Sequence, residues 1–461
     1  MNIKMNFTGK AKLNDDEFIM FYDQLWEKAP HKCLHNIPSA TEIQNRKKIR
    51  EKIYNKEEPK ILENEVWDYF PGYIKYLVSS EGRIKFEIEN GEYQLIKQDD
   101  FDRNQPGYLV LKPENQKVRI NTTRKSYVFV AITFLGKIEG DGYHVHHIDN
   151  NGYDCSTDNL ILLTSSQHDA VHSERKMNKE ELIDFLSDRR HEEEIKKRLA
   201  LYKVNTLRIE NCGIYKKYKT KYPYILPEKE KKQNLIMTSY KSQFNDLYTR
   251  MEPSLHTCFA HLNSSQALCF NLFYPLILTN HLSLIESSIS MAAKASFEHV
   301  EDVSFEKVKN PKEKTNFDFF INDEGKKYFF EIKYTEATFG NVETFTNNDR
   351  HDKKYNDFYK DQIKKIASEE ITEDEFFENY QIWRNICHAD VGKVFFVFLK
   401  SRKSLEKKIL TTINKCKDIY KTQISILYIE DLVDACLKVQ DDKFRKHYIE
   451  FSEKYLSYIK V

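Results

Sequence analysis

Two segments of the chain concentrate side chains that bind metal ions and carry protons. The first, VHHIDNNGYDCSTDNLILLTSSQHDAVH, covers residues 145–172, and the second, TNFDFFINDEGKKYFFEIKYTEATFG, covers residues 315–340. Hydrolysis of a phosphodiester needs a base that takes a proton from water and a cation beside the phosphate. Both segments contain residue types that could meet these needs, so each predicts a hydrolytic centre.

The first segment is rich in histidine at informative spacings. His146 and His147 end a predicted strand, and Asn159 follows a glycine-containing loop. His168 and His172 are four positions apart, so both can face one side of a helix. Adjacent strand residues point to opposite faces, so we expect the strand to bend at the first pair, as the following Ile-Asp-Asn-Asn-Gly indicates. Surface histidines in a polar loop are the alternative, but the combined spacing favours a metal centre.

The second segment places two carboxylates and one ammonium on neighbouring strands. Glu331 and Lys333 are two positions apart in an apolar strand, so they project to the same face, and Asp318 lies on the strand before. Such a set binds Mg²⁺ and positions or deprotonates the attacking water. A chance match to Asp…Glu-X-Lys is the alternative. It explains Lys333 poorly, because burying an unpaired charge among apolar residues is costly.

The elements around these segments predict an α+β chain of several domains. Residues 1–60 indicate a charged helical segment, and residues 61–175 a β-rich region that ends in the histidine-rich segment. Residues 176–232 indicate a charged helical linker, with a domain boundary at PYILPEKEKKQ. Residues 233–461 predict an α/β domain with a mixed central sheet, because three strands are followed by a helix and a further strand. The apolar stretch 127–137 could be a helix or a strand.

Residues 66–172 resemble the phage-type HNH, or ββα-metal, endonucleases, through the HH, NL and HxxxH residues described above. The resemblance implies that His147 is the general base and that Asn159 orients it. It also implies a divalent ion at this centre, Mg²⁺, Mn²⁺, Ni²⁺ or Zn²⁺, with three histidine ligands: His146, His168 and His172.

A DNA-binding region is expected just before this centre. The stretch VWDYFPGYIKYLVSSEGRIKF resembles a small motif that precedes the catalytic part of many HNH endonucleases and helps to hold DNA. The matching residues are Trp67, Pro71, Gly72, Val78, Ser79, Gly82 and Arg83. We expect the DNA contacts of this region to come from Arg83, Lys85, Arg124 and Lys125.

Residues 255–440 resemble the PD-(D/E)XK restriction-endonuclease-like proteins, through NFDFFI and FFEIKYTEATFG. Phe317 stands where that motif has its proline, which makes the match less specific. The resemblance implies a restriction-endonuclease-like α/β fold. In it, Asp318 and Glu331 bind Mg²⁺ or Mn²⁺ and carry out catalysis together with Lys333.

Further residues could assist this second centre. In the PD-(D/E)XK proteins the preceding helix or the first strand often supplies another acidic residue, and Glu286 and Glu298 are both candidates here. Gln381, on the helix after the centre, could orient the lysine or contact DNA.

Composition limits the class of protein without identifying it. A chain of 461 residues and 55.0 kDa can hold two or three domains. Its net charge of +1 gives no overall basic bias, although local clusters of Lys and Arg are enough to bind phosphates. We see neither a signal peptide nor a long apolar run, and no CxxC pair. We therefore expect a cytoplasmic protein with reduced thiols and no membrane partner.

These expectations combine into one functional hypothesis. The chain would be a metal-dependent endonuclease with two catalytic centres that cleaves double-stranded DNA, phage DNA being a candidate, in restriction or anti-phage defence. The main alternative is a DNA-binding or regulatory protein in which one nuclease fold serves recognition only, and a homing-type mobile endonuclease is a further one. RNA as a substrate and a homo-oligomeric state both stay open.

Overall fold

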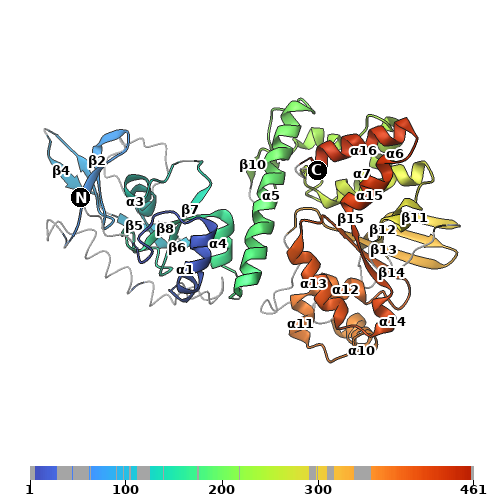
Figure 1. Cartoon of the computed structure of the whole chain (residues 1–461). Coiled ribbons are helices and arrows are strands. Elements are labelled where there is room, and N and C mark those ends of the chain that lie inside the picture. The colour runs from blue at the N-terminus through green and yellow to red at the C-terminus, as the bar shows by residue number, and fades with distance from the viewer. Residues whose placement is uncertain are drawn as a thin grey trace. The chain divides into compact units, whose positions relative to one another are not determined.

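The computed structural model describes residues 6–28, 44, 62, 64–89, 91–96, 98–102, 105–111, 125–138, 140–173, 176–216, 219–289, 297, 299–308, 316–336 and 355–457. Figure 1 shows the helices and strands that they form. The chain divides into two compact units, Met1–Leu186 and Ser187–Val461. Both units combine helices with sheets, which confirms the predicted α+β class. None of the helices in these residues is long and apolar enough to cross a membrane.

The first unit is built from antiparallel strands and short helices. Four strands form a sheet in the order β1-β2-β3-β4, while β5–β6 and β7–β8 form two-stranded ribbons. Its elements are α1 (Asp15–Lys28), β1 (Trp67–Phe70), β2 (Tyr73–Ser79), β3 (Ile84–Glu87), β4 (Tyr93–Leu95), β5 (Gln98–Asp102), β6 (Gln105–Leu111), α3 (Ser126–Phe134), β7 (Tyr143–His147), β8 (Leu160–Thr164) and α4 (Ser165–Val171).

The β7–β8 ribbon lies between two apolar clusters, because successive side chains of a strand point to opposite faces. Leu160 and Leu162 join a cluster with α3 and the four-stranded sheet. Ile161 and Leu163 join a second cluster with α1, α4 and the start of α5 (Lys179–Asn205). Burial of both faces fixes the register of the ribbon.

The apolar stretch 127–137, which could have been a helix or a strand, forms most of the helix α3.

The second unit is built on a five-stranded mixed sheet with the order β11-β12-β13-β14-β15. The first three strands are antiparallel, and β13, β14 and β15 are parallel. After the remainder of α5, the elements are β9 (Gly213–Tyr215), β10 (Thr220–Tyr222), η1 (Glu228–Asn234), α6 (Lys241–Met251), η2 (Glu252–Ser254), α7 (Ser265–Leu278), α8 (Leu284–Ser287), β11 (Val300–Val308), β12 (Asn316–Asp323), β13 (Lys326–Ile332), η3 (Tyr355–Tyr359), α10 (Lys360–Ile366), α11 (Glu373–Glu378), α12 (Tyr380–Ile386), β14 (Lys393–Phe398), α13 (Lys403–Asn414), α14 (Asp418–Lys421), β15 (Ile424–Tyr428), α15 (Ile429–Leu437) and α16 (Asp442–Tyr455).

Helices cover both faces of this sheet. Phe330 and Phe395 belong to an apolar cluster shared with α7, α15 and α16, while Phe329 and Phe396 belong to one shared with α10 to α13. Figure 1 shows α15 and α16 on one side of the sheet and α10 to α13 on the other. Strands buried on both faces read as continuous apolar runs, which is why FFEI and VFFVF carry so few polar residues.

Residues 187–232 contribute to the core of the second unit. Ile195 and Leu199 of α5, together with Ile225 and Leu226, are fully or almost fully buried in the cluster around α7. The buried guanidinium of Arg402 donates hydrogen bonds to backbone carbonyls of both Asp188 (2.9 Å) and Glu336 (2.6 Å). The four-part division made from the sequence stays a prediction, and these contacts indicate where a stable fragment should begin.

We expect a fragment of residues 187–461 to unfold cooperatively and a fragment of residues 233–461 to be unfolded or molten. The shorter fragment lacks Ile195, Leu199, Ile225 and Leu226, and loss of each buried side chain of this size costs about 2–5 kcal/mol. Urea denaturation followed by near- and far-UV circular dichroism would measure this difference. Equal midpoints for the two fragments would show that residues 187–232 are dispensable for the fold.

Candidate active sites

The first candidate site is formed by the β7–β8 ribbon and α4. The two strands pair in continuous register, with His146 opposite Ile161 and His147 opposite Leu160. Helix α4 follows β8 without a loop, because Thr164 caps it: the Thr164 side chain accepts from Gln167 N, and the Gln167 side chain accepts from Thr164 N. This capping box holds the first turn of the helix against the end of the strand.

Three histidines from this ribbon and helix converge. The ligand atoms of His146, His168 and His172 all lie within 4.8 Å of one another, and His146 Nδ1 is 3.2 Å from His172 Nε2. Burial and then the neighbouring His172 and His144 lower the pKa of His168 to about 3, and burial also lowers the pKa of His172. Neutral imidazole is the form that binds metals, so this donor set fits a divalent cation.

His147 lies on the other face of β7, against α3. Its ring meets Tyr127 edge-on with centroids 4.9 Å apart, whereas the ring of His146 packs against His168 and His172. The expectation that the strand bends to bring the two histidines to one face is wrong, because the ribbon keeps its register through both residues. Burial, and secondarily Lys125, lowers the pKa of His147 to about 3, so its imidazole is neutral at ordinary pH.

Asn159 closes the loop that joins the two strands. Its Nδ2 donates to Asp149 Oδ1 (2.8 Å) and to the carbonyl of Asp154 (3.0 Å), and its Oδ1 accepts from Asp149 N (3.1 Å). Its backbone carbonyl also accepts from Ile148 N at 2.8 Å. These bonds hold the residues that directly follow His147, so an orienting effect of Asn159 on that histidine would act through the loop backbone.

The second candidate site lies where β12 begins and the antiparallel β13 ends, at one end of these two strands of the mixed sheet. Phe319 pairs with Phe330, and the next positions outward on the two strands are Asp318 and Glu331. Asp318 Oδ2 accepts a hydrogen bond from Ile332 N at 2.6 Å. Lys333 Nζ donates to Glu331 Oε1 at 3.0 Å, so the three predicted residues are brought together.

The charges at this site are strongly perturbed. Burial, and next the nearby Glu331 carboxylate, raises the pKa of Asp318 well above its ordinary value. Burial also opposes ionisation of Glu331, but Lys333 and Arg384 lower its pKa below the ordinary value. Burial disfavours the ammonium of Lys333, yet Glu331, Glu336 and Asp318 raise its pKa. Buried carboxylate oxygens of this kind are the ligands that Mg²⁺ and Mn²⁺ prefer, so these residues fit such a cation.

Glu306 on β11 is a further carboxylate at this site, and the sequence reasoning missed it. Its φ of 53° lies in the left-handed region, which a non-glycine residue in a strand rarely adopts. Its carboxylate accepts from Gln266 Nε2 at 2.7 Å and lies 3.5 Å from His256 Nε2. Glu306 is close enough to Asp318 to raise the pKa of that carboxyl group. The strand preceding NFDFFI carries three acids, Glu301, Asp302 and Glu306, and no local pattern singles out Glu306 among them.

The remaining predicted residues of the second site are placed differently. Glu286 Oε1 accepts a hydrogen bond from Phe297 N at 2.6 Å. Among the described residues, Glu286 forms no hydrogen bond with Asp318. Glu298 lies outside the described residues. Gln381 lies on α12, the helix that also carries Arg384, and Arg384 NH2 is 3.6 Å from Glu331 Oε2.

The predicted DNA-contact residues divide into two kinds. Arg83 is 1% exposed and forms a bidentate ion pair with Glu65, so it holds the β2–β3 turn in place and offers no surface to a phosphate. Lys85 lies over the ring of Trp67, with Nζ 4.3 Å from its centroid, and Lys125 lies over Tyr127 at 5.7 Å. Arg124 lies outside the described residues.

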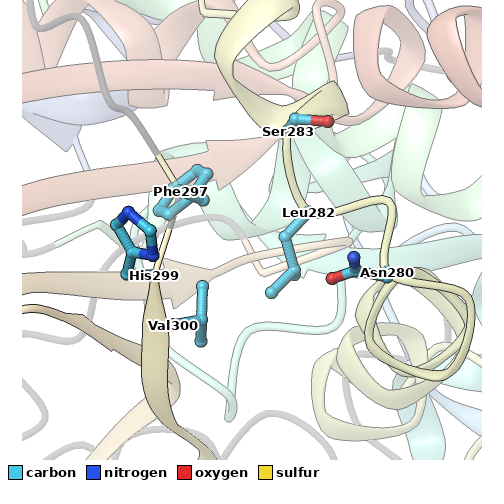
Figure 2. A pocket seen from close by; sticks show the side chains of 6 residues that line it. All are labelled: Asn280, Leu282, Ser283, Phe297, His299 and Val300. Carbon is cyan, nitrogen blue, oxygen red and sulfur yellow. The ribbon is translucent and has the colours of Figure 1, made fainter.

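The second unit also contains a pocket of about 560 Å³ (Figure 2). The described residues that line it are Asn280, Leu282, Ser283, Phe297, His299 and Val300.

Comparison with known proteins supports both halves of the resemblance drawn from the sequence. A family model described as Restriction Endonuclease associating with ARP matches residues 196–456, and one described as HNH endonuclease matches residues 128–170. The predicted order, an HNH part followed by a restriction-endonuclease part, is thereby confirmed. No curated protein and no solved structure matches the chain.

The perturbed carboxyl group predicts that Asp318→Asn stabilises the metal-free protein. Asparagine can still accept from Ile332 N, but it removes a buried acid that faces Glu331 and Glu306. With its raised pKa, folded Asp318 keeps a proton that the unfolded chain releases above about pH 4, so the wild type loses stability as the pH rises.

The variant should therefore be the more stable protein, with a gap that widens by up to about 1.4 kcal/mol per pH unit as the pH is raised from about 4 toward neutral. Urea denaturation with EDTA present at several pH values would measure it. Asp246→Asn, at an exposed position on α6, is the matched control and should show no such trend. A wild type that is the more stable protein throughout this range would refute the assignment.

Proposed function

The chain belongs to the family of restriction endonucleases associating with ARP, whose model covers more than half of it, and we propose that it is a metal-dependent DNA endonuclease with two catalytic centres. The HNH match supports a nuclease centre in the first unit as well. The observation that carries the proposal is the convergence of three histidine ligand atoms within 4.8 Å on a ββα element. The close placement of Asp318, Glu331 and Lys333 at one end of β12 and β13 supports the second centre.

At the first centre we assign His146, His168 and His172 as ligands and His147 as the base. A divalent cation held there would stabilise the charge that develops on the phosphate and the leaving oxygen. Neutral His147 takes the proton from the attacking water. In an in-line displacement the water and the leaving oxygen lie on opposite sides of phosphorus. The placement of His147 and the metal ligands on opposite faces of β7 suits that geometry.

At the second centre we assign Asp318 and Glu331 as ligands of Mg²⁺ or Mn²⁺, with Glu306 as a neighbouring acid. A cation at these carboxylates would polarise the phosphate and help to deprotonate the bound water. The pKa of Lys333 is raised, so its amine stays protonated. We therefore assign Lys333 to hold the water and to oppose the negative charge of the phosphate, and not to act as the base.

We propose duplex DNA as the substrate, with one strand cut at each centre or with separate substrates for the two. Membership of a restriction-endonuclease family supports foreign DNA, such as phage DNA, as the target. Lys85 and Lys125 remain the proposed phosphate contacts of the first unit, because both are at least partly accessible. The alternative, in which one nuclease fold only recognises DNA, predicts that a single substitution abolishes all cleavage.

Substitution at each centre in turn tests this proposal. On supercoiled plasmid DNA, His147→Ala should leave only the cleavage made by the second centre, and Lys333→Ala only that made by the first. The double variant should be slower by at least about 100-fold, the usual contribution of a positioned acid or base. Lys327→Ala, an exposed lysine on the same strand as Glu331, is the matched control. Complete loss of cleavage in one single variant would favour the recognition role for the other fold.

The ligand types predict different metal requirements at the two centres. The Lys333→Ala protein, which relies on imidazole ligands, should cut with Mn²⁺, Ni²⁺ or Zn²⁺ as well as Mg²⁺. The His147→Ala protein, which relies on carboxylates, should cut only with Mg²⁺ or Mn²⁺. Initial rates measured with each chloride salt after treatment with EDTA would compare them. Identical metal profiles for the two proteins would contradict the ligand assignment.

A further inference from the structure

One carboxylate of the second centre is bound by two cationic side chains. Lys333 Nζ lies 3.0 Å from Glu331 Oε1, and Arg384 NH2 lies 3.6 Å from Glu331 Oε2. The three side chains are largely buried, with exposures of 13% for Lys333, 15% for Arg384 and 5% for Glu331. Both oxygens that a metal ion would use are thus already facing a positive charge.

This arrangement cannot persist unchanged when a divalent cation binds. A cation at Glu331 would lie within a few ångströms of the guanidinium, and repulsion between like charges is strong where water is largely excluded. Lys333 directly follows β13, and its backbone is held because its N–H donates to the carbonyl of Val397 at 2.8 Å. Arg384 reaches the site from α12 on a longer side chain, so it is the group that can move.

The surroundings of Arg384 favour a guanidinium that exchanges partners. Its Nε donates to Asn385 Oδ1 at 3.3 Å, and its guanidinium carbon is 5.8 Å from the centre of the Tyr380 ring. The helix beneath is firmly anchored, because Ile382, Trp383 and Ile386 are 0–1% exposed. A guanidinium has five N–H donors and matches a phosphate in bidentate fashion, so most of its donors remain for a substrate.

We propose that Arg384 is a further catalytic residue of the second centre, pairing with Glu331 in the metal-free protein and moving to the scissile phosphate when the cation binds. This inference rests on the proposed function of that centre. In its second position the guanidinium would oppose the negative charge that grows on the phosphate oxygens, in the way that positioned donors stabilise a transition state.

The test uses the full-length His147→Ala/His168→Ala protein, so that only the second centre cuts and the histidine ligand set of the first centre is broken. Mg²⁺ affinity is measured without DNA by calorimetry, and cleavage is measured in single turnover at saturating Mg²⁺. Arg384→Gln should bind Mg²⁺ several-fold more tightly, because a competing charge is gone, yet cut about 100-fold more slowly. Arg384→Lys should keep affinity close to that of the parent and lose less of the rate. Arg445→Gln, at a partly exposed arginine on α16 that pairs with Asp442, is the matched control for both measurements.

The possible outcomes distinguish the role of Arg384 from the proposed nuclease activity of the second centre. Tighter Mg²⁺ binding combined with slower cleavage supports the exchange, since damage to the fold would weaken both. If Arg384→Gln loses Mg²⁺ affinity and thermal stability together, Arg384 is a structural partner of Glu331 and the inference is overturned. An unchanged cleavage rate overturns it as well. Glu331→Gln tests the centre itself: if that variant cuts at the parent rate, the proposed second centre fails, whatever Arg384 does.

Discussion

A β-strand presents successive side chains to opposite faces, and both candidate centres depend on this alternation. In β7 it sends His146 toward α4 and His147 toward α3, so two neighbouring residues serve two sides of a ribbon. At the end of β13 it sends Glu331 and the following Lys333 to the same side, where they form an ion pair, while Ile332 between them enters the apolar cluster around α7. The same rule thus separates the proposed base from the proposed metal ligands in the first unit, and it brings a carboxylate and an ammonium together in the second.

In the second unit the alternation places ionisable groups inside a sheet that is covered on both faces, and burial of a charge is unfavourable. The pKa of Asp318 is raised, which favours its neutral form, and the Glu331 carboxylate is paired with two cationic side chains. Glu306 adds a left-handed backbone conformation of the kind that clusters at functional sites. Apolar residues at these positions would make the sheet more stable. The presence of buried ionisable residues there is typical of a functional site.

The sequence predicted what depends on local spacing. The histidine positions, the Asp…Glu-X-Lys pattern and the mixed sheet all follow from strand and helix periods, and the structure brings the named side chains together. What it could not predict depends on contacts between distant residues. Glu306 comes close to Asp318 only because β11 pairs with β12. Its left-handed backbone conformation cannot be recognised from the residue types around it. Arg83 looked like a phosphate contact because nothing local reveals its pairing with Glu65.

The direct passage from β8 into α4 has a consequence for which insertions and deletions this part of the chain can accept. Each residue added to an α-helix rotates everything after it by about 100°, so one residue inserted after His168 would turn His172 away from its partners. Residues 160–172 should therefore have a fixed length among relatives. The loop before them is tied by Asn159 at Asp149 and Asp154, and Tyr153 within it is 2% exposed in the apolar core. The whole stretch from His147 to His172 should therefore accept few changes in length.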